Sequence, residues 1–100
     1  MMTVAFKWDP AKAASNLRKH GVSFEMAKEI FADPNHVVIE NDHVQSQDEQ
    51  RSLIIGMTGA LILLAVIFVD QSDPTCEVIR IISARKAVAY EQSIYEDQNC

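Results

Sequence analysis

The sequence predicts a single α+β domain, with a mainly antiparallel sheet covered by helices on one face and the element order β-α-α-β-β-β-α. Three observations predict it. The chain has 100 residues, the size of one domain. Two segments near the N-terminus start with helix-capping residues, and the segments after residue 35 have strand periodicity. These later segments are joined by short connections, which favour antiparallel pairing.

The N-terminal third is expected to hold one strand and two helices. Residues 4–8 alternate apolar and polar side chains, as a half-buried strand does. A helix follows, capped at its start by Asp9 and terminated by Gly21, which tolerates a left-handed backbone. A second helix begins after Ser23 and ends at Asp33-Pro34.

The remainder is expected to form the sheet and a last helix. The segment 60–69 is apolar on both faces, which is typical of a strand inside a sheet, and it pairs with 51–57 through a tight turn at Thr58-Gly59. Ser83 is expected to cap a C-terminal helix. The other predicted strands are 36–40 and 76–83, with a polar loop at 41–50 and a turn-rich loop at 70–75.

Composition excludes some classes of protein. The chain is 48% hydrophobic and 23% charged, so it is not broadly disordered. Its net charge of −5 excludes a strongly basic coat protein for nucleic acid. The charge is uneven, however: residues 1–28 hold five basic residues against two acids, whereas residues 29–79 hold one against nine. Positive charge is therefore concentrated near the N-terminus and after residue 79.

Two features bear on location. The chain has two cysteines and does not begin with a secretory signal, so we expect a reduced, cytoplasmic protein. Ser52–Val69 is 18 residues long and uncharged, which meets the length of a membrane span. Gly56 and Gly59 interrupt it and β-branched residues dominate it, so two strands are the better interpretation. We expect no contact with membranes.

The last predicted strand carries the main candidate site. Ile79 and Ile81 would face the core, which places Arg80 on the less covered face. An arginine between apolar neighbours needs an anion, either a carboxylate of the protein or a substrate phosphate. Arg85 and Lys86 follow near the predicted helix start, where free N–H groups also attract anions. His36 and His43 match no metal motif, His20 is expected to have a helix-capping or dipole role, and we expect neither a metal nor a cofactor.

Several motifs resemble the BrnT family of ribonuclease toxins from type II toxin–antitoxin pairs. The resemblance extends over nearly the whole chain and is most specific in two blocks, KHGVSF at 19–24 and IRIISAR at 79–85. The other matching stretches are FKWDPAK at 6–12, NLR at 16–18, FADP at 31–34, DEQR at 48–51 with IIG at 54–56, and then Glu91 and Tyr95.

The resemblance implies a RelE-like fold and cleavage of RNA without the ribosome. It also implies neutralisation by a BrnA-type antitoxin, whose ribbon-helix-helix part binds the promoter DNA, so that the toxin reaches DNA only through its antitoxin. Carried over to this chain, the catalytic residues would be Arg80 and Arg85, with Lys12 and Arg51. Lys7 and Lys86 would join the two arginines in binding RNA. Glu49, His20 and Tyr90 remain alternative general bases.

This chain also departs from the family pattern by lacking basic residues that many members carry. Gln50 precedes Arg51 where an arginine pair is common, Asp70-Gln71 stands where an arginine is common, and residues 87–92 hold no basic residue. Each loss weakens RNA binding, which rests mainly on phosphate contacts. The alternative function is therefore a weak or catalytically dead toxin homologue that binds the antitoxin as a co-repressor module.

Overall fold

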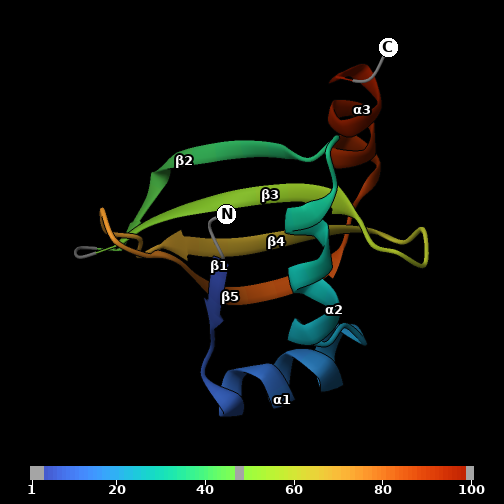
Figure 1. Ribbon diagram of the computed structural model, residues 1–100. Coiled ribbons are helices and arrows are strands. Elements are labelled where there is room, and N and C mark those ends of the chain that lie inside the picture. Colours follow the sequence, from blue (N-terminus) through green and yellow to red (C-terminus); the bar gives the residue numbers. More distant parts are fainter. Residues whose placement is uncertain (1–3, 47–48, 99–100) are drawn as a thin grey trace.

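The computed structural model describes residues 4–46 and 49–98, with the backbone alone considered at residues 41–46 and 49. A five-stranded sheet forms its centre (Figure 1). Along the chain the elements are β1 (Val4–Lys7), α1 (Pro10–His20), α2 (Phe24–Lys28), the 3-10 helix η1 (Glu29–Ala32), β2 (Val37–Ser46), β3 (Glu49–Met57), β4 (Leu63–Asp70), β5 (Glu77–Lys86) and α3 (Ala89–Gln98).

The sheet is mainly antiparallel, as predicted. Its strand order is β1-β5-β4-β3-β2, and only the β1–β5 pairing is parallel among the described strands. The central strand is β4, whose sequence is apolar from Leu63 to Val69, which fits burial on both faces. Four strands follow the helices, matching the four predicted segments 36–40, 51–57, 60–69 and 76–83, whereas the predicted order β-α-α-β-β-β-α counts only three of them.

Helix α1 begins and ends where its capping residues predict, and α2 begins after Ser23 as predicted. The predicted helix up to Asp33-Pro34 is α-helical only to Lys28 and continues as the 3-10 helix η1 to Ala32. The Asp9 carboxylate accepts a hydrogen bond from the Ala11 N–H at 2.8 Å, and Gly21 ends α1 with φ 70°. The Ser23 hydroxyl oxygen accepts from the Met26 N–H at 3.1 Å and so caps α2. Local hydrogen bonding alone accounts for these ends, which is why sequence reasoning located them.

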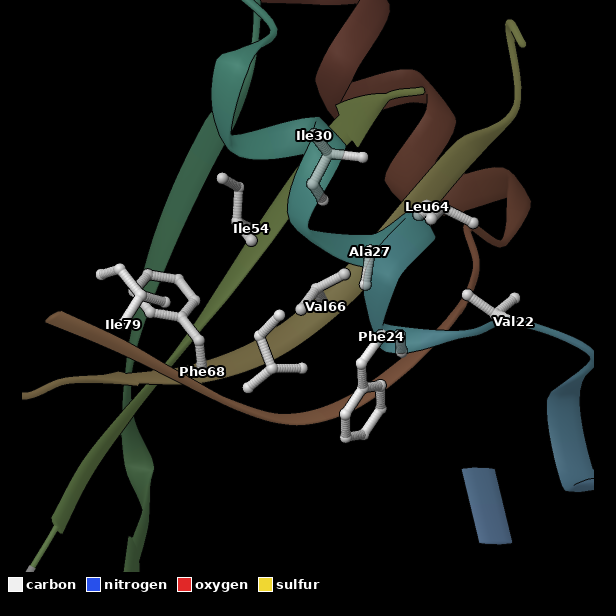
Figure 2. Close-up of a cluster of buried hydrophobic side chains, with 11 residues drawn as sticks. Val22, Phe24, Ala27, Ile30, Ile54, Leu64, Val66, Phe68 and Ile79 are labelled. Atoms are coloured by element: carbon white, nitrogen blue, oxygen red, sulfur yellow. The ribbon is translucent and has the colours of Figure 1, made fainter. Parts of the chain in front are cut away.

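The main core lies between these helices and one face of the sheet. Ala27 and Ile30, from α2 and η1, point towards Ile54 and Val66 of the sheet in Figure 2. All four side chains are at most 1% exposed. Burying a side chain the size of valine or isoleucine contributes about 2 kcal/mol, so this layer is a main source of hydrophobic stabilisation.

Gly56 allows η1 to approach β3 closely. A Cβ atom built at this position would lie 2.9 Å from Ile30 Cβ and 3.0 Å from the Ile30 carbonyl oxygen. Because no real Cβ atom sits that close, only glycine fits here without a shift of η1.

Two predicted boundaries in the sheet were wrong. Residues 41–46 continue β2, and β3 begins at Glu49, so most of the predicted polar loop 41–50 is strand. Strand pairing needs only backbone hydrogen bonds, and a polar edge strand gives no apolar alternation to detect. The turn between β3 and β4 covers residues 58–62, so β4 begins at Leu63 and not at residue 60 as predicted. Leu61 adopts φ 63° within this turn.

The C-terminal helix starts later than predicted. Ser83 lies inside β5, which continues to Lys86, and α3 begins at Ala89. The Glu91 carboxylate accepts a hydrogen bond from the Val88 N–H at 2.9 Å, which is the backward half of a capping box. The prediction failed because Ser83 could cap a helix only if the pairing of β5 with β4 stopped before this residue.

Helix α3 does not join the layer formed by α1 and α2. It contacts β2 and β3, and its Glu91 pairs with Arg85, which points to the opposite face of β5 from the core residue Ala84. Ile55 is fully buried but lies outside the main core cluster, on the face that α3 partly covers. The expectation of helices on one face alone was therefore wrong.

Asn16 of α1 holds the outer edge of β5 beyond the end of β1. Its amide Nδ2 donates to the Ala84 carbonyl at 2.8 Å, and its Oδ1 accepts from the Ala84 N–H at 3.1 Å. Nδ2 also donates to the Val22 carbonyl at 3.0 Å. One carboxamide thus satisfies backbone groups that a neighbouring strand would otherwise pair.

The uncharged segment Ser52–Val69 forms parts of β3 and β4 with the turn between them. Across residues 4–46 and 49–98, no helix has the length and apolar character required to cross a membrane.

Candidate anion-binding site on the sheet

A bulge in β5 places Arg80 and Arg85 on the same face of the sheet. Ile81 pairs with Phe68 and Ser83 pairs with Ile67, so Ile82 has no partner in β4. The two arginines are five positions apart, and a regular strand would put them on opposite faces. Because Ile82 is an extra, unpaired residue, every side chain after it changes face. Arg85 therefore lies on the same face as Arg80, and both arginines point away from the main core.

Three basic residues lie in one row across that face. Lys7 of β1 pairs with Arg80 of β5, Arg80 pairs with Val69 of β4, and Val69 pairs with Arg51 of β3. Residues that oppose one another in a sheet share a face. We call Lys7, Arg80 and Arg51 the cationic row. Adjacent strands lie about 4.8 Å apart, so the row spans about 14 Å.

The surroundings of the row favour anions. Val69 lies within it, and Ile67 and Val78 are its apolar neighbours on the same face. Like charges on opposing positions repel one another, and an anion between them relieves the repulsion. A phosphate is attracted more strongly beside apolar walls than in open water.

Arg51 contributes a buried donor to the row. Its Nε atom is buried and makes no hydrogen bond with the residues that the structure describes. A buried guanidinium N–H without an acceptor costs free energy, and a bound oxyanion would supply that acceptor.

Arg85 lies on the same face but is bound to another partner. Its two terminal nitrogens donate to the two carboxylate oxygens of Glu91, at 2.7 and 2.9 Å. The pair lowers the pKa of Glu91 and raises that of Arg85, with the mutual hydrogen bonds as the largest cause. Arg85 opposes Ala65, four residues from Val69 along β4, so it lies about 13 Å from the cationic row.

The other predicted site residues lie elsewhere. Lys12 is exposed on α1, which packs against the helix-covered side of β5. Lys86 is exposed and opposes Leu64, a core residue, so it points to the face opposite Arg85. Arg85 and Lys86 end a strand instead of flanking a helix start, which corrects the predicted site built on that start.

None of the alternative general bases adjoins the row among side chains that the structure describes. His20 is exposed at the C-terminal end of α1, and Tyr90 is 75% exposed in the first turn of α3. The side chain of Glu49 lies outside the described residues, as does that of His43.

His36 hydrogen-bonds through Nδ1 to the Asp33 carbonyl at 2.7 Å. Within the described part of the chain, no three His, Cys, Asp or Glu residues gather as a metal site.

Sequence reasoning missed Glu91 as the partner of Arg85. The signal was present, because a glutamate three residues after a helix start is typical of a capping box. It was not recognised because the helix was expected to begin at Ser83, which places Glu91 in the helix interior.

The fold and the site together define a small α+β protein whose sheet carries the cationic row on one half of one face. The chain matches the family model described as the ribonuclease toxin BrnT of type II toxin–antitoxin systems, over residues 8–91, and it belongs to that family. It is similar to the crystal structure of the Brucella abortus ribonuclease toxin BrnT, with a TM-score of 0.62 and 28% identity. That match covers 86% of this chain and 99% of the Brucella chain. No curated protein matches.

Proposed function

We propose that this protein is an active ribonuclease toxin that cleaves RNA at the cationic row without a metal ion, and that a BrnA-type antitoxin neutralises it in the cytoplasm. The observation that carries the proposal is the alignment of Lys7, Arg80 and Arg51 on one sheet face. Membership of the BrnT family supports it. The RelE-like strand topology and the ribbon-helix-helix partner that controls promoter DNA belong to the same proposal.

The chemistry suits these residue types. RNA cleaves itself when its 2′-hydroxyl is held in line with the adjacent phosphate and the developing charge is neutralised. Arg80 would hold the phosphate through two parallel N–H donors, and Arg51 would neutralise charge from the other side of Val69. Lys7, at the exposed edge, would contact a neighbouring phosphate.

The test is RNA cleavage by the purified protein in EDTA at low salt, compared with Lys7→Ala, Arg51→Ala and Arg80→Ala. Each row variant should cut at least about tenfold more slowly, which corresponds to roughly 1.4 kcal/mol of lost transition-state stabilisation. Lys28→Ala is the matched control, because it removes one exposed positive charge on α2 away from the row. Equal losses in Lys28→Ala and the row variants would contradict the site. Cleavage that stops in EDTA would contradict a metal-free mechanism.

One observation favours a second function, a catalytically weak homologue that acts as an antitoxin-binding co-repressor module. Arg85 is held by Glu91 in a two-hydrogen-bond pair, so this arginine is engaged within the protein. Intact RNA after incubation with the folded wild-type protein, together with no growth arrest on expression, would support this second function over the first.

A further inference from the structure

The helix-covered face of the sheet has an open groove at the same end as the cationic row. Helices α2 and η1 cover this face near Leu64 and Val66, and the groove lies on the part of the face beyond them, above Ile54 and Phe68. The groove has a volume of about 500 Å³ and is lined by residues from all five strands, with Phe31 and His36 at one side. It therefore crosses the strands, directly behind the face that carries the row.

The groove combines an apolar floor with an acidic rim. Val4, Phe31 and Val38 are partly or largely accessible apolar side chains in its lining, and Val38 is 46% exposed. Glu40, Asp70 and Glu77 supply the only formal charges among its described lining residues, since no lysine or arginine is present there. Hydrogen bonds from Ser72, including its N–H at 2.9 Å, lower the pKa of Asp70, so this carboxylate stays ionised.

We propose that this groove is the docking site of a basic amphipathic helix from a protein partner. This inference rests on the proposed function only in that a type II toxin has a protein partner. Five strands span about 19 Å, which is the length of about 13 helical residues. A helix of that length would bury its apolar face on the groove floor, beside α2 and η1, and place lysines or arginines against the three carboxylates.

The charge separation between the two faces makes the docking specific. The exposed half of one face carries Lys7, Arg80 and Arg51, whereas the exposed half of the other carries Glu40, Asp70 and Glu77. RNA is repelled from the acidic face, and a basic helix is repelled from the cationic row. A partner helix in the groove therefore leaves the row accessible unless another segment of the partner covers it.

The test uses a synthetic peptide of about 13 residues, held helical by a lactam bridge, with leucines on one face and lysines beside them. The comparison peptide has glutamates in place of the lysines. Fluorescence anisotropy at low salt should show binding of the basic peptide alone. The combined variant Glu40→Gln, Asp70→Asn, Glu77→Gln should weaken it at least about tenfold. Glu25→Gln, Glu96→Gln, Asp97→Asn is the matched control, as it removes the same charge from exposed helix positions and should change binding less than about twofold.

Three results would overturn the proposal. They are equal binding of both peptides, equal losses of peptide binding in both triple variants, and dimerisation of the free protein that Val38→Glu abolishes. The last result would assign the groove to a second copy of the chain. Amide shift perturbations in the wild-type protein give a readout that needs no variant: they should centre on Val38, Phe68 and Glu77 and spare Arg85, which lies at the other end of β5. The carboxylate variant should retain RNA cleavage, so a failed nuclease test and a failed docking test are distinguishable.

Discussion

Arg85 donates two hydrogen bonds to Glu91, and this pair joins the end of β5 to the first turn of α3. The Glu91 side chain is 8% exposed and that of Arg85 is 40% exposed. A carboxylate buried this far is stable only while the guanidinium and the Val88 N–H remain bound to it. Arg85 thus has a structural role whether or not it contacts RNA.

Glu91→Gln is expected to destabilise the protein by about 2 kcal/mol, because the substitution removes the charge and one acceptor from a nearly buried site. Arg85→Ala should have a similar cost, and the double variant should cost less than the sum of the two. Chemical denaturation measures all three. Additive losses would show that the two side chains are not coupled. RNA cleavage by Arg85→Ala is informative only at a temperature where that variant is folded.

The same pair predicts acid sensitivity. Because the hydrogen bonds from Arg85 hold the pKa of Glu91 below its ordinary value of 4.5, the pair stabilises the fold fully above that pH. Its contribution is lost as the pH falls through the lowered pKa. Denaturation midpoints measured from pH 6 downwards should therefore decline in the wild type more steeply than in Glu91→Gln. Parallel declines would mean that other carboxylates control acid unfolding.

Tyr95 predicts a second, opposite pH dependence. Its hydroxyl donates to Asp33 Oδ2 at 2.7 Å, and burial together with this bond raises its pKa from 10.0 to about 12. The phenol contributes stability fully below pH 10 and loses it as the pH rises towards 12. Tyr95→Phe should cost about 1 kcal/mol at pH 8 and lose less stability between pH 9 and 11 than the wild type. Ultraviolet titration of the tyrosinate checks the pKa directly, with Tyr90→Phe as the control for the exposed tyrosine.

Asn16→Ala is expected to cost about 3 kcal/mol. The change leaves the Ala84 N–H and two carbonyl groups without their partners in a buried place. Ser15→Ala, at the adjacent exposed position on α1, should change stability by less than about 0.5 kcal/mol. Thermal unfolding followed by circular dichroism compares them. A small effect of Asn16→Ala would indicate that water replaces the carboxamide at this edge.

Gly56→Ala tests the close approach of η1 to β3. The added methyl group would collide with Ile30, so a loss of about 2 kcal/mol is expected. Gly59→Ala is the matched control, since the nearest atom to its added Cβ would be Glu29 Oε1 at 3.5 Å. Equal stability of the two variants would show that η1 moves away from the sheet at little cost.

Sequence reasoning located the elements whose signals are local. Asp9, Gly21 and Ser23 act through hydrogen bonds and backbone angles within a few residues, so the helix ends they mark were predictable. The start of α3 was not, because whether Ser83 caps a helix or continues a strand depends on pairing with Ile67. Distant pairing of this kind leaves no local pattern in the sequence.

The candidate site could likewise be predicted only in part, because its assembly depends on pairing between distant segments. Arg80 was predicted on the less covered face from simple alternation, but the alignment of Lys7 with it requires the parallel β1–β5 pairing of residues more than seventy positions apart. The bulge at Ile82 is equally hidden, since one extra residue changes the face of every later side chain in β5. Without this bulge, Arg85 would point into the layer formed by α1 and α2.

The contact between Asn16 and Ala84 also bears on how the molecule avoids self-assembly. β1 pairs with β5 only over residues 77–80, which would leave the rest of that sheet margin open as a template for a foreign strand. The Asn16 carboxamide occupies the Ala84 N–H and C=O there, so an incoming chain finds no donor or acceptor at that residue. A single side chain thereby blocks the addition of a further strand at this point of the sheet edge.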